Sequence, residues 1–300
     1  MTRNVCITAI DGQTGFLIAE LLLKESKFTK QINSITGLAL HPSIPKCKEL
    51  ESLGAKIVPH HPGRERQMVK TLQEVGCDTI CVIPPAHEDK VDITIELCEA
   101  AKKAGVQNVL LISAAGCDYA ERHKQPRLRE FIDIENIVLS SKGDPSVDLG
   151  HSPCVIRAGF YAENLLLYTQ QAQLNGILPL PIGHNHKFAP VALGDIAHVA
   201  ACVLAGKGKK GFKDPPRARK RIFRGPLFFR ILKAQADIDD SEKEYLLEYY
   251  SLVREGKTNY VVTTAFHDVT GEQPTQPSEF FRMYSQELRP KKKAKTDNFT

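Results

Sequence analysis

Short hydrophobic runs alternate with longer amphipathic stretches from residue 4 to about residue 160. Runs rich in apolar and β-branched residues predict strands, and apolar positions spaced three and four residues apart predict helices. The expected strands cover residues 4–10, 32–40, 55–60, 78–85, 106–116 and 152–159. The expected helices between them cover residues 13–26, 42–54, 64–76, 90–105 and 127–141. On the first of these helices, one face would carry Phe16, Ala19, Leu22 and Leu23.

This alternation predicts an α/β fold with a doubly wound parallel sheet. The runs "TICVI" and "VLLIS" are apolar throughout, as expected of strands that are covered on both faces. Ligands of such sheets bind beyond the carboxyl ends of the strands. We therefore look for chemistry in the residues that follow each strand.

After residue 160 the regular alternation ends. We expect helices over residues 161–173, 195–206, 240–257 and 277–289, and a strand pair or extended arm over residues 177–194. Asp195 is the expected N-cap of its helix. The predicted organisation is a binding domain over residues 1–158, a smaller lobe over 159–288 with an irregular part at 213–230, and a basic tail over 289–300.

The composition is that of a globular protein without a membrane segment. The chain is 42% hydrophobic and 25% charged, and no run approaches the roughly 20 apolar residues that span a bilayer. The N-terminal residues lack the pattern of a signal peptide. Eight cysteines are scattered without a CxxC pair, which favours reduced, buried thiols. We therefore expect a cytoplasmic protein.

The formal charge of +5 comes from two segments. Residues 207–224 hold nine Lys and Arg against one Asp, and residues 289–295 hold five more, so the rest of the chain is acidic. This distribution does not suit a general nucleic-acid binder, and no DNA-reading helix motif is visible. The tail at 289–295 fits either a nuclear localisation signal or a solvated terminus.

The first strand leads into a turn with the pattern Ala9-x-x-Gly12-x-x-Gly15. Such a turn presents backbone N–H groups and the positive end of a helix to a phosphate. Gly12 would allow close approach of a pyrophosphate, and Gly15 would allow the helix to pack on the sheet. Ala9 replaces the glycine that usually occupies the tightest bend. Further polar atoms around the loop come from Asp11, Gln13 and Thr14.

The second strand ends without the acid that would bind a ribose 2′-hydroxyl. His41, Lys46 and Lys48 follow it instead, which favours a phosphorylated ribose. A solvated, basic start of a helix explains the same residues equally well.

Four blocks together resemble the NmrA-like proteins, a group of atypical short-chain dehydrogenases, with the fungal members as the expected nearest group. The blocks are "ITAIDGQTGFLIAELLL", residues 82–118, "VIRAGFYAENLLL" and "FAPVALGDIAHVAACVLAG". The resemblance covers residues 4 to about 212 and about 231 to 290. It implies a Rossmann domain with a smaller C-terminal lobe, and binding of NADP(H) or NAD(H). With the basic residues after the second strand, NADP(H) is the expected cofactor rather than NAD(H).

The resemblance also implies positions for the cofactor. The turn would hold the pyrophosphate, with Ala9, Asp11 and His41 among the binding residues. Pro84 and Pro85 would line the adenosine side. The nicotinamide would be bordered by Ser113 and Ala114, and closed from the second lobe by Gly159, Phe160 and Asn164.

Several positions depart from the family pattern. Leu40 stands where members often carry Arg, and Phe131 stands where some reductases carry Lys or His. Tyr119 is followed four positions on by His123, so the Tyr-x-x-x-Lys pair is absent there. Ser113 and Tyr119 remain the candidate catalytic residues. Roughly 40 residues of the substrate lobe are missing around 213–230, which suggests an altered or truncated coding segment.

Two other groups were considered. The pairs His60–His61 and His184–His186 lack carboxylate or cysteine partners at ligand spacing, so no metal site is expected. Arg157 could form an ion pair with an acid near the cofactor, in a structural or a functional role.

The sequence therefore supports two hypotheses. One is an NAD(P)H-dependent reductase that transfers hydride to a small quinone- or carbonyl-type substrate. The other is a dinucleotide sensor without catalytic activity that regulates a transcription-factor partner.

Overall fold

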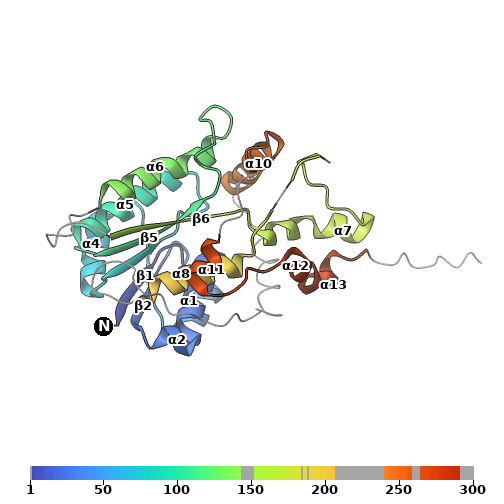
Figure 1. The fold of residues 1–300 in the computed structure, drawn as a ribbon. Coiled ribbons are helices and arrows are strands. Elements are labelled where there is room, and N and C mark those ends of the chain that lie inside the picture. The colour runs from blue at the N-terminus through green and yellow to red at the C-terminus, as the bar shows by residue number, and fades with distance from the viewer. Residues whose placement is uncertain are drawn as a thin grey trace, which may run out of the picture.

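The computed structural model describes residues 2–142, 152–183, 185–187, 189–206, 240–258 and 264–290. Six parallel strands form one sheet in the order β3-β2-β1-β4-β5-β6, which confirms the predicted doubly wound fold (Figure 1). The strands are β1 (Arg3–Ile7), β2 (Ile32–Ala39), β3 (Lys56–Pro59), β4 (Thr79–Val82), β5 (Asn108–Ala114) and β6 (Ser152–Ala158). The strand order reverses at β1, so the turn after β1 lies at the switch point where ligands of such sheets bind.

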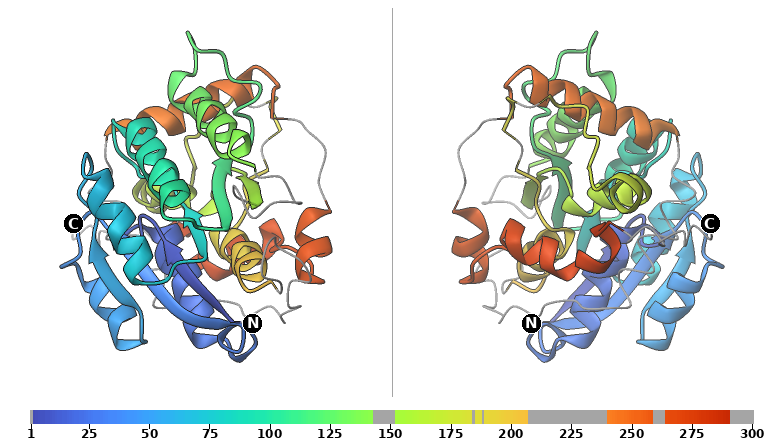
Figure 2. Two further views of the ribbon diagram at one scale, coloured as in Figure 1. Left: turned by 90° about the vertical axis from the view of Figure 1, so that its left-hand side faces the viewer. Right: turned by 90° about the vertical axis from the view of Figure 1, so that its right-hand side faces the viewer.

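Helices cover both faces of the sheet (Figures 1 and 2). One core cluster joins the sheet to α1 (Gln13–Lys24), α3 (Pro45–Ser52) and α8 (Leu193–Leu204). The other cluster joins the opposite face to α4 (Glu65–Glu74), α5 (Lys90–Lys103) and α6 (Pro126–Ser140). A short helix that the sequence pattern did not predict, α2 (Ser26–Thr29), follows α1.

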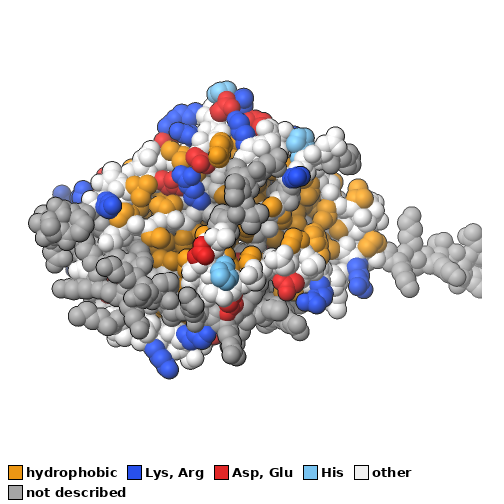
Figure 3. Space-filling model, in the orientation of Figure 1, with side chains coloured by type: hydrophobic (Ala, Val, Ile, Leu, Met, Phe, Trp, Pro, Cys, Tyr) orange, Lys and Arg blue, Asp and Glu red, His pale blue; other side chains and the backbone are white. Residues whose placement is uncertain are grey.

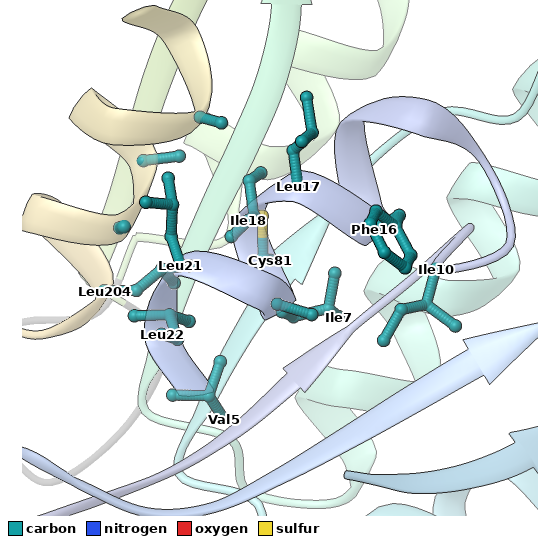
Figure 4. Close-up of a cluster of buried hydrophobic side chains, with 14 of the residues drawn as sticks. Val5, Ile7, Ile10, Phe16, Leu17, Ile18, Leu21, Leu22, Cys81 and Leu204 are labelled. Atoms are coloured by element: carbon teal, nitrogen blue, oxygen red, sulfur yellow. The ribbon is translucent and has the colours of Figure 1, made fainter. Parts of the chain in front are cut away.

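Helix α1 is buried on more of its circumference than its sequence pattern indicates. Phe16, Ala19 and Leu22 are buried as predicted, but Leu17 and Leu21 are buried as well. The reason is that α8 packs beside α1 on the same face of the sheet, where it also contacts β5. Figure 4 shows these side chains between β1, α1 and α8. A helix from late in the chain therefore completes the core of the first domain.

The remaining described elements form the smaller C-terminal part. They are the 3₁₀ helix η1 (Ala162–Tyr168), α7 (Thr169–Asn175), α10 (Asp240–Arg254), α11 (Ala265–Thr270), α12 (Pro277–Met283) and α13 (Ser285–Leu288). Three large hydrophobic side chains are exposed in or just after these helices: Leu174, Ile177 and Phe281. Figure 3 shows hydrophobic side chains on the surface of the molecule in the orientation of Figure 1. Helix α10 packs on α6, so this part contacts the sheet domain directly.

Of the two expectations for residues 177–194, the strand pair is wrong for the described residues, and the extended arm stays a prediction. Among the described residues between α7 and α8, only Val191 forms a β-bridge, an isolated one with Tyr161, which lies before η1. Pro179, Pro181 and Pro190 interrupt this stretch, and a proline has no N–H to donate to a ladder.

The predicted N-cap of α8 is also wrong. The helix begins at Leu193 with Ala192 as its N-cap, and Asp195 lies in the first turn. The Asp195 carboxylate accepts two hydrogen bonds from Thr275, one from its N–H and one from its hydroxyl at 2.9 Å. The Leu193 N–H donates instead to Glu163 Oε2 at 2.9 Å. Tertiary contacts, rather than the local sequence, therefore satisfy the start of this helix.

Several predictions fall outside the described residues. They concern the irregular segment 213–230, its hypothesis of an altered coding segment, His184, and the tail beyond residue 290. The domain boundary at residue 158 stays a prediction. Within the described ranges, no helix combines the length and apolar character needed to cross a bilayer.

Candidate functional site

The turn after β1 adopts a backbone conformation that glycine usually supplies. Ala9 has a φ of +45°, and it is the only non-glycine residue in the described part of the chain with a positive φ. For an L-residue this conformation costs about 1–2 kcal/mol. The strain is compensated locally, because the Gly12 N–H donates to the Ala9 carbonyl at 3.0 Å and closes the turn. The alanine substitution therefore preserves the bend.

Both glycines of the motif face the Ala9 carbonyl. A Cβ atom on Gly15 would lie 2.5 Å from that oxygen and 2.8 Å from the Cα of Ile10, so only glycine fits where α1 packs on the turn. A Cβ atom on Gly12 would lie 3.1 Å from the same oxygen. Gly12 is also the N-cap of α1, and no side chain caps this helix. The turn thus combines a close main-chain surface with an uncapped helix start, which suits a phosphate.

Side chains fix the turn to the neighbouring strands. The Thr8 hydroxyl accepts from the Ile83 N–H at 2.8 Å and donates to the Ile83 carbonyl at 3.1 Å. This pair joins the ends of β1 and β4, directly before Pro84 and Pro85. On the other side, Asp11 Oδ2 accepts from the His41 N–H at 2.8 Å, which joins the turn to the end of β2. The structure therefore places Asp11, His41 and the turn together.

An ion-pair network around the buried carboxylate of Glu135 occupies the ends of β5 and β6. Glu135 on α6 accepts from Arg157 Nε at 2.9 Å and from Arg157 Nη2 at 2.7 Å. The Ser113 hydroxyl donates to Glu135 Oε1 at 2.5 Å, and the Cys117 thiol is 3.6 Å from the same oxygen. Arg157 Nη1 also lies 3.0 Å from Asp118. The predicted acid partner of Arg157 is thus present.

This network bears on the candidate catalysts. Burial would raise the pKa of Glu135, but the hydrogen bonds from Arg157 and Ser113 outweigh it and the pKa is lowered. The Ser113 proton is directed to this carboxylate and not toward the sheet edge. Burial raises the pKa of Cys117 to about 12, so the thiol stays protonated. Tyr119 is 51% exposed in a turn.

A tyrosine that sequence reasoning did not single out lies beside the turn. Tyr161 follows β6, and the residues on both sides of it are hydrogen-bonded to Val191: Val191 N–H to the Phe160 carbonyl and Ala162 N–H to the Val191 carbonyl, both 2.8 Å. Burial raises the pKa of Tyr161 to about 12, although its hydrogen bond with Thr14 opposes the rise. Its phenol is therefore protonated at neutral pH and borders the turn.

A second tyrosine reaches the same region from α10. Burial raises the pKa of Tyr245 well above its ordinary value, and the charges of Glu242 and Tyr161 contribute to the rise. Its ring lies 5.9 Å from that of Phe131. Lys90 Nζ in turn lies 4.4 Å from the centre of the Phe131 ring and 2.9 Å from Glu130 Oε2. A lysine therefore does lie beside the position of Phe131, but it comes from α5.

The other predicted cofactor residues lie along the same edge of the sheet. Pro84 and Pro85 follow β4, Ala114 ends β5, and Gly159 follows β6. Phe160 is buried between the rings of Tyr249 and Tyr250, at 5.2 Å from each. The Asn164 N–H donates to the Tyr161 carbonyl at 3.0 Å. Their roles toward a cofactor stay predictions.

The described residues contain no group of His, Cys, Asp and Glu arranged to hold a metal. All eight cysteines are free thiols, and seven of them are buried, as the sequence predicted. The residues that sequence reasoning missed are Tyr161, Tyr245 and Glu135. Only the GFYAEN stretch carried a signal, because it follows a predicted strand; Glu135 and Tyr245 lie in ordinary amphipathic helices.

Comparisons with known proteins agree with this architecture. No family model matches the chain. It is 25% identical over 176 residues to an NmrA-like family domain-containing protein of Dictyostelium discoideum, covering 57% of this chain and 55% of that protein. It is 26% identical over 206 residues to an NAD(P)H azoreductase of Xenophilus azovorans, covering 68% and 65%. The chain thus spans less than two thirds of the length of these relatives.

Solved structures show the same fold over nearly the whole chain. The NADPH complex of an NADPH-dependent quinone oxidoreductase from Escherichia coli superposes with a TM-score of 0.69 at 20% identity, covering 93% of this chain and 98% of that one. The NADP(H) complex of a triphenylmethane reductase from a Citrobacter species gives 0.66 at 15%, covering 95% and 100%. The expected fungal affinity stays a prediction. The chain is therefore similar to an NmrA-like family domain-containing protein and to an azoreductase, and it has the Rossmann-like fold of these solved structures.

Proposed function

We propose that this protein is an NADP(H)-dependent reductase that transfers hydride to a small quinone- or carbonyl-type substrate. The observation that carries the proposal is the turn after β1, where Gly12 and Gly15 leave space that a Cβ would fill, beside the uncapped start of α1. The named activities of the azoreductase and quinone oxidoreductase relatives support the same class of reaction.

The residues present fit a dinucleotide. The main-chain N–H groups of Gln13, Thr14 and Gly15, in the first turn of α1, would bind the pyrophosphate, and Asp11 with His41 would face the adjacent ribose. The His41 side chain is 78% exposed at the end of β2, where it could meet a 2′-phosphate. When bound, NADPH would supply the hydride, and the protein would orient it against the substrate.

The proton for the reduced substrate would come from the partly buried tyrosines Tyr161 and Tyr245 rather than from Ser113. Ser113 donates its hydrogen to Glu135 at 2.5 Å, whereas burial keeps Tyr161 and Tyr245 protonated. A protonated phenol can donate a hydrogen bond to a carbonyl or quinone oxygen and so stabilise the charge that develops on it.

Two measurements on the full chain test the proposal. Binding of NADPH is followed by the emission of its nicotinamide, and oxidation is then followed by its absorbance with a panel of quinones. We expect binding and turnover, with Tyr161→Phe lowering kcat by about 10- to 100-fold at an unchanged Kd for NADPH. Absence of dinucleotide binding contradicts the proposal outright, and tight binding without oxidation by any quinone contradicts the reductase activity.

A further inference from the structure

The chain on either side of Tyr161 is held against the segment that leads into α8. Both neighbours of Tyr161 are hydrogen-bonded to Val191, each at 2.8 Å. Two residues further along each segment, the Leu193 N–H donates to Glu163 Oε2 at 2.9 Å. The two bonds of Val191 join main-chain groups, which do not titrate, whereas the acceptor of the third bond is a carboxyl group. One of these three bonds therefore depends on a proton.

Glu163 is one of two carboxyl groups buried at the start of α8. Its exposed fraction is 5%, and that of Asp195, in the first turn of the helix, is 7%. Asp195 lies two residues after Leu193, which bonds Glu163, so the two carboxyl groups lie at the same helix start. Asp195 accepts two hydrogen bonds from Thr275, which favour its ionised form. A second buried charge beside it is costly, so Glu163 is the group that takes up a proton.

The groups around Glu163 come from several elements. Burial raises the pKa of Glu163 to about 7, the hydrogen bond from the Leu193 N–H opposes the rise, and the charge of Asp195 adds to it. Burial also raises the pKa of Tyr161 before η1 and of Tyr284 between α12 and α13, and the charge of Glu163 adds to both rises. Glu163 therefore changes its charge near neutral pH, where these phenols stay neutral.

Tyr161 lies between the two residues bonded to Val191 and two positions before Glu163, so its place depends on how these segments pair. We propose that Glu163 is a positioning residue, which holds Tyr161 beside the turn while it carries its proton and no longer holds it once ionised. An ionised Glu163 gains much more from water than a neutral one does, so ionisation favours separation of the segments. The inference rests on the proposed function, because it takes Tyr161 to serve the reduced substrate.

Hydrogen exchange measures the separation of the two segments and needs no turnover. The paired state holds the Glu163 proton with a pKa of about 7, whereas a hydrated Glu has an ordinary value of 4.5. Opening should therefore become easier as the pH rises from 5 to 8. We expect exchange of the Ala162 and Leu193 amides, corrected for the pH dependence of exchange in an unfolded chain, to increase by about 10- to 100-fold over this range.

Glu163→Gln is the decisive variant, because its side-chain carbonyl can still accept from the Leu193 N–H but the side chain never ionises. Its corrected exchange should change by less than about twofold between pH 5 and pH 8. Glu99→Gln serves as the matched control. Its carboxylate is 55% exposed on α5, which packs on the face of the sheet opposite α8. This variant should keep the pH dependence of the unmodified protein.

The same proteins test the effect on Tyr161. Between pH 6 and pH 8, the kcat for reduction of a quinone by NADPH should fall about three- to tenfold in the unmodified protein relative to Glu163→Gln. The Kd for NADPH should stay the same in both, since the turn that would bind the pyrophosphate keeps its hydrogen bonds. A merely structural role of Glu163 would not separate kcat from Kd in this way.

Two results would overturn the inference. One is the same corrected exchange profile in the unmodified protein and in Glu163→Gln, and the other is the same pH profile of kcat in both. Absence of NADPH binding or of turnover contradicts the proposed function instead. The exchange measurement is independent of that failure and still decides whether the proton of Glu163 holds the two segments together.

Discussion

The two halves of the carboxyl edge of the sheet differ in how their polar groups are used. At the turn after β1, no side chain caps α1, and Gly12 and Gly15 leave the main chain open. At the ends of β5 and β6, Ser113, Glu135 and Arg157 bind one another. Polar groups whose hydrogen bonds are made within the protein hold the structure, whereas polar groups without such bonds are available to a ligand. The Ser113 hydroxyl, in the expected catalytic place, already donates its hydrogen bond to Glu135 in this structure.

The largest effect on stability is expected at the ends of β5 and β6. Glu135→Ala removes the buried partner of Arg157, so the free energy of unfolding should fall by about 2–3 kcal/mol, discounted because Arg157 is partly exposed. The affinity for NADPH should stay within about threefold. Urea unfolding and NADPH titration of the same preparation measure both. A large loss of NADPH affinity in a folded variant would show that the network also serves binding.

A second buried carboxylate sharpens the comparison, because its pKa is raised whereas that of Glu135 is lowered. Burial raises the pKa of Glu163 from 4.5 to about 7, opposed by the hydrogen bond from the Leu193 N–H. The folded state holds this proton more tightly than the unfolded state does. The stability contributed by the group is therefore complete below about pH 4.5 and is lost as the pH rises to about 7.

The measurement compares the protein with Glu163→Gln, whose carbonyl can still accept from Leu193. The difference in unfolding free energy between the two should shift by about 2–3 kcal/mol between pH 5 and pH 8. The unmodified protein should become less stable relative to the variant as the pH rises. A difference that is flat across this range would mean that Glu163 is ionised in the fold throughout.

At the turn after β1, a smaller substitution should affect NADPH binding rather than stability. A Cβ on Gly12 would lie 3.1 Å from the Ala9 carbonyl, a contact that the turn can absorb with a slight shift. Gly12→Ala should therefore weaken NADPH binding by about tenfold while the unfolding midpoint changes little. This is the reverse of the result expected for Glu135→Ala. Equal NADPH affinity in the variant and the unmodified protein would place the pyrophosphate elsewhere.

The smallest effect concerns the strained residue of the turn. Ala9→Gly removes the penalty of a φ of +45° but adds chain entropy to the unfolded state, so a net gain of about 0.5–1 kcal/mol is expected. Ala104→Gly, at a φ of −76°, should instead destabilise the protein by up to about 1 kcal/mol. Thermal unfolding of the two variants shows whether each change raises or lowers stability. A loss of stability in both would mean that Ala9 is not strained.

The first half of the chain could be predicted closely because its signals are local. Each strand from β1 to β6 appears in the sequence as an apolar run, and the glycine turn marks the switch point. The stretch from residue 177 to 194 was misjudged because its apolar residues resemble strands, although its prolines prevent a ladder. Asp195 resembled a cap, yet it binds Thr275, 80 residues along the chain.

What the sequence determined by itself is therefore the doubly wound parallel sheet and the glycine turn after its first strand, since hydrophobic periodicity and glycine positions are properties of neighbouring residues. Only the tertiary structure decided which polar groups at the sheet edge are satisfied. Ser113 donates to Glu135, which is 22 positions along the chain, and Tyr161, after β6, is hydrogen-bonded to Thr14 at the start of α1. Hydrogen bonds over such separations depend on packing, and packing leaves no periodic trace in the chain.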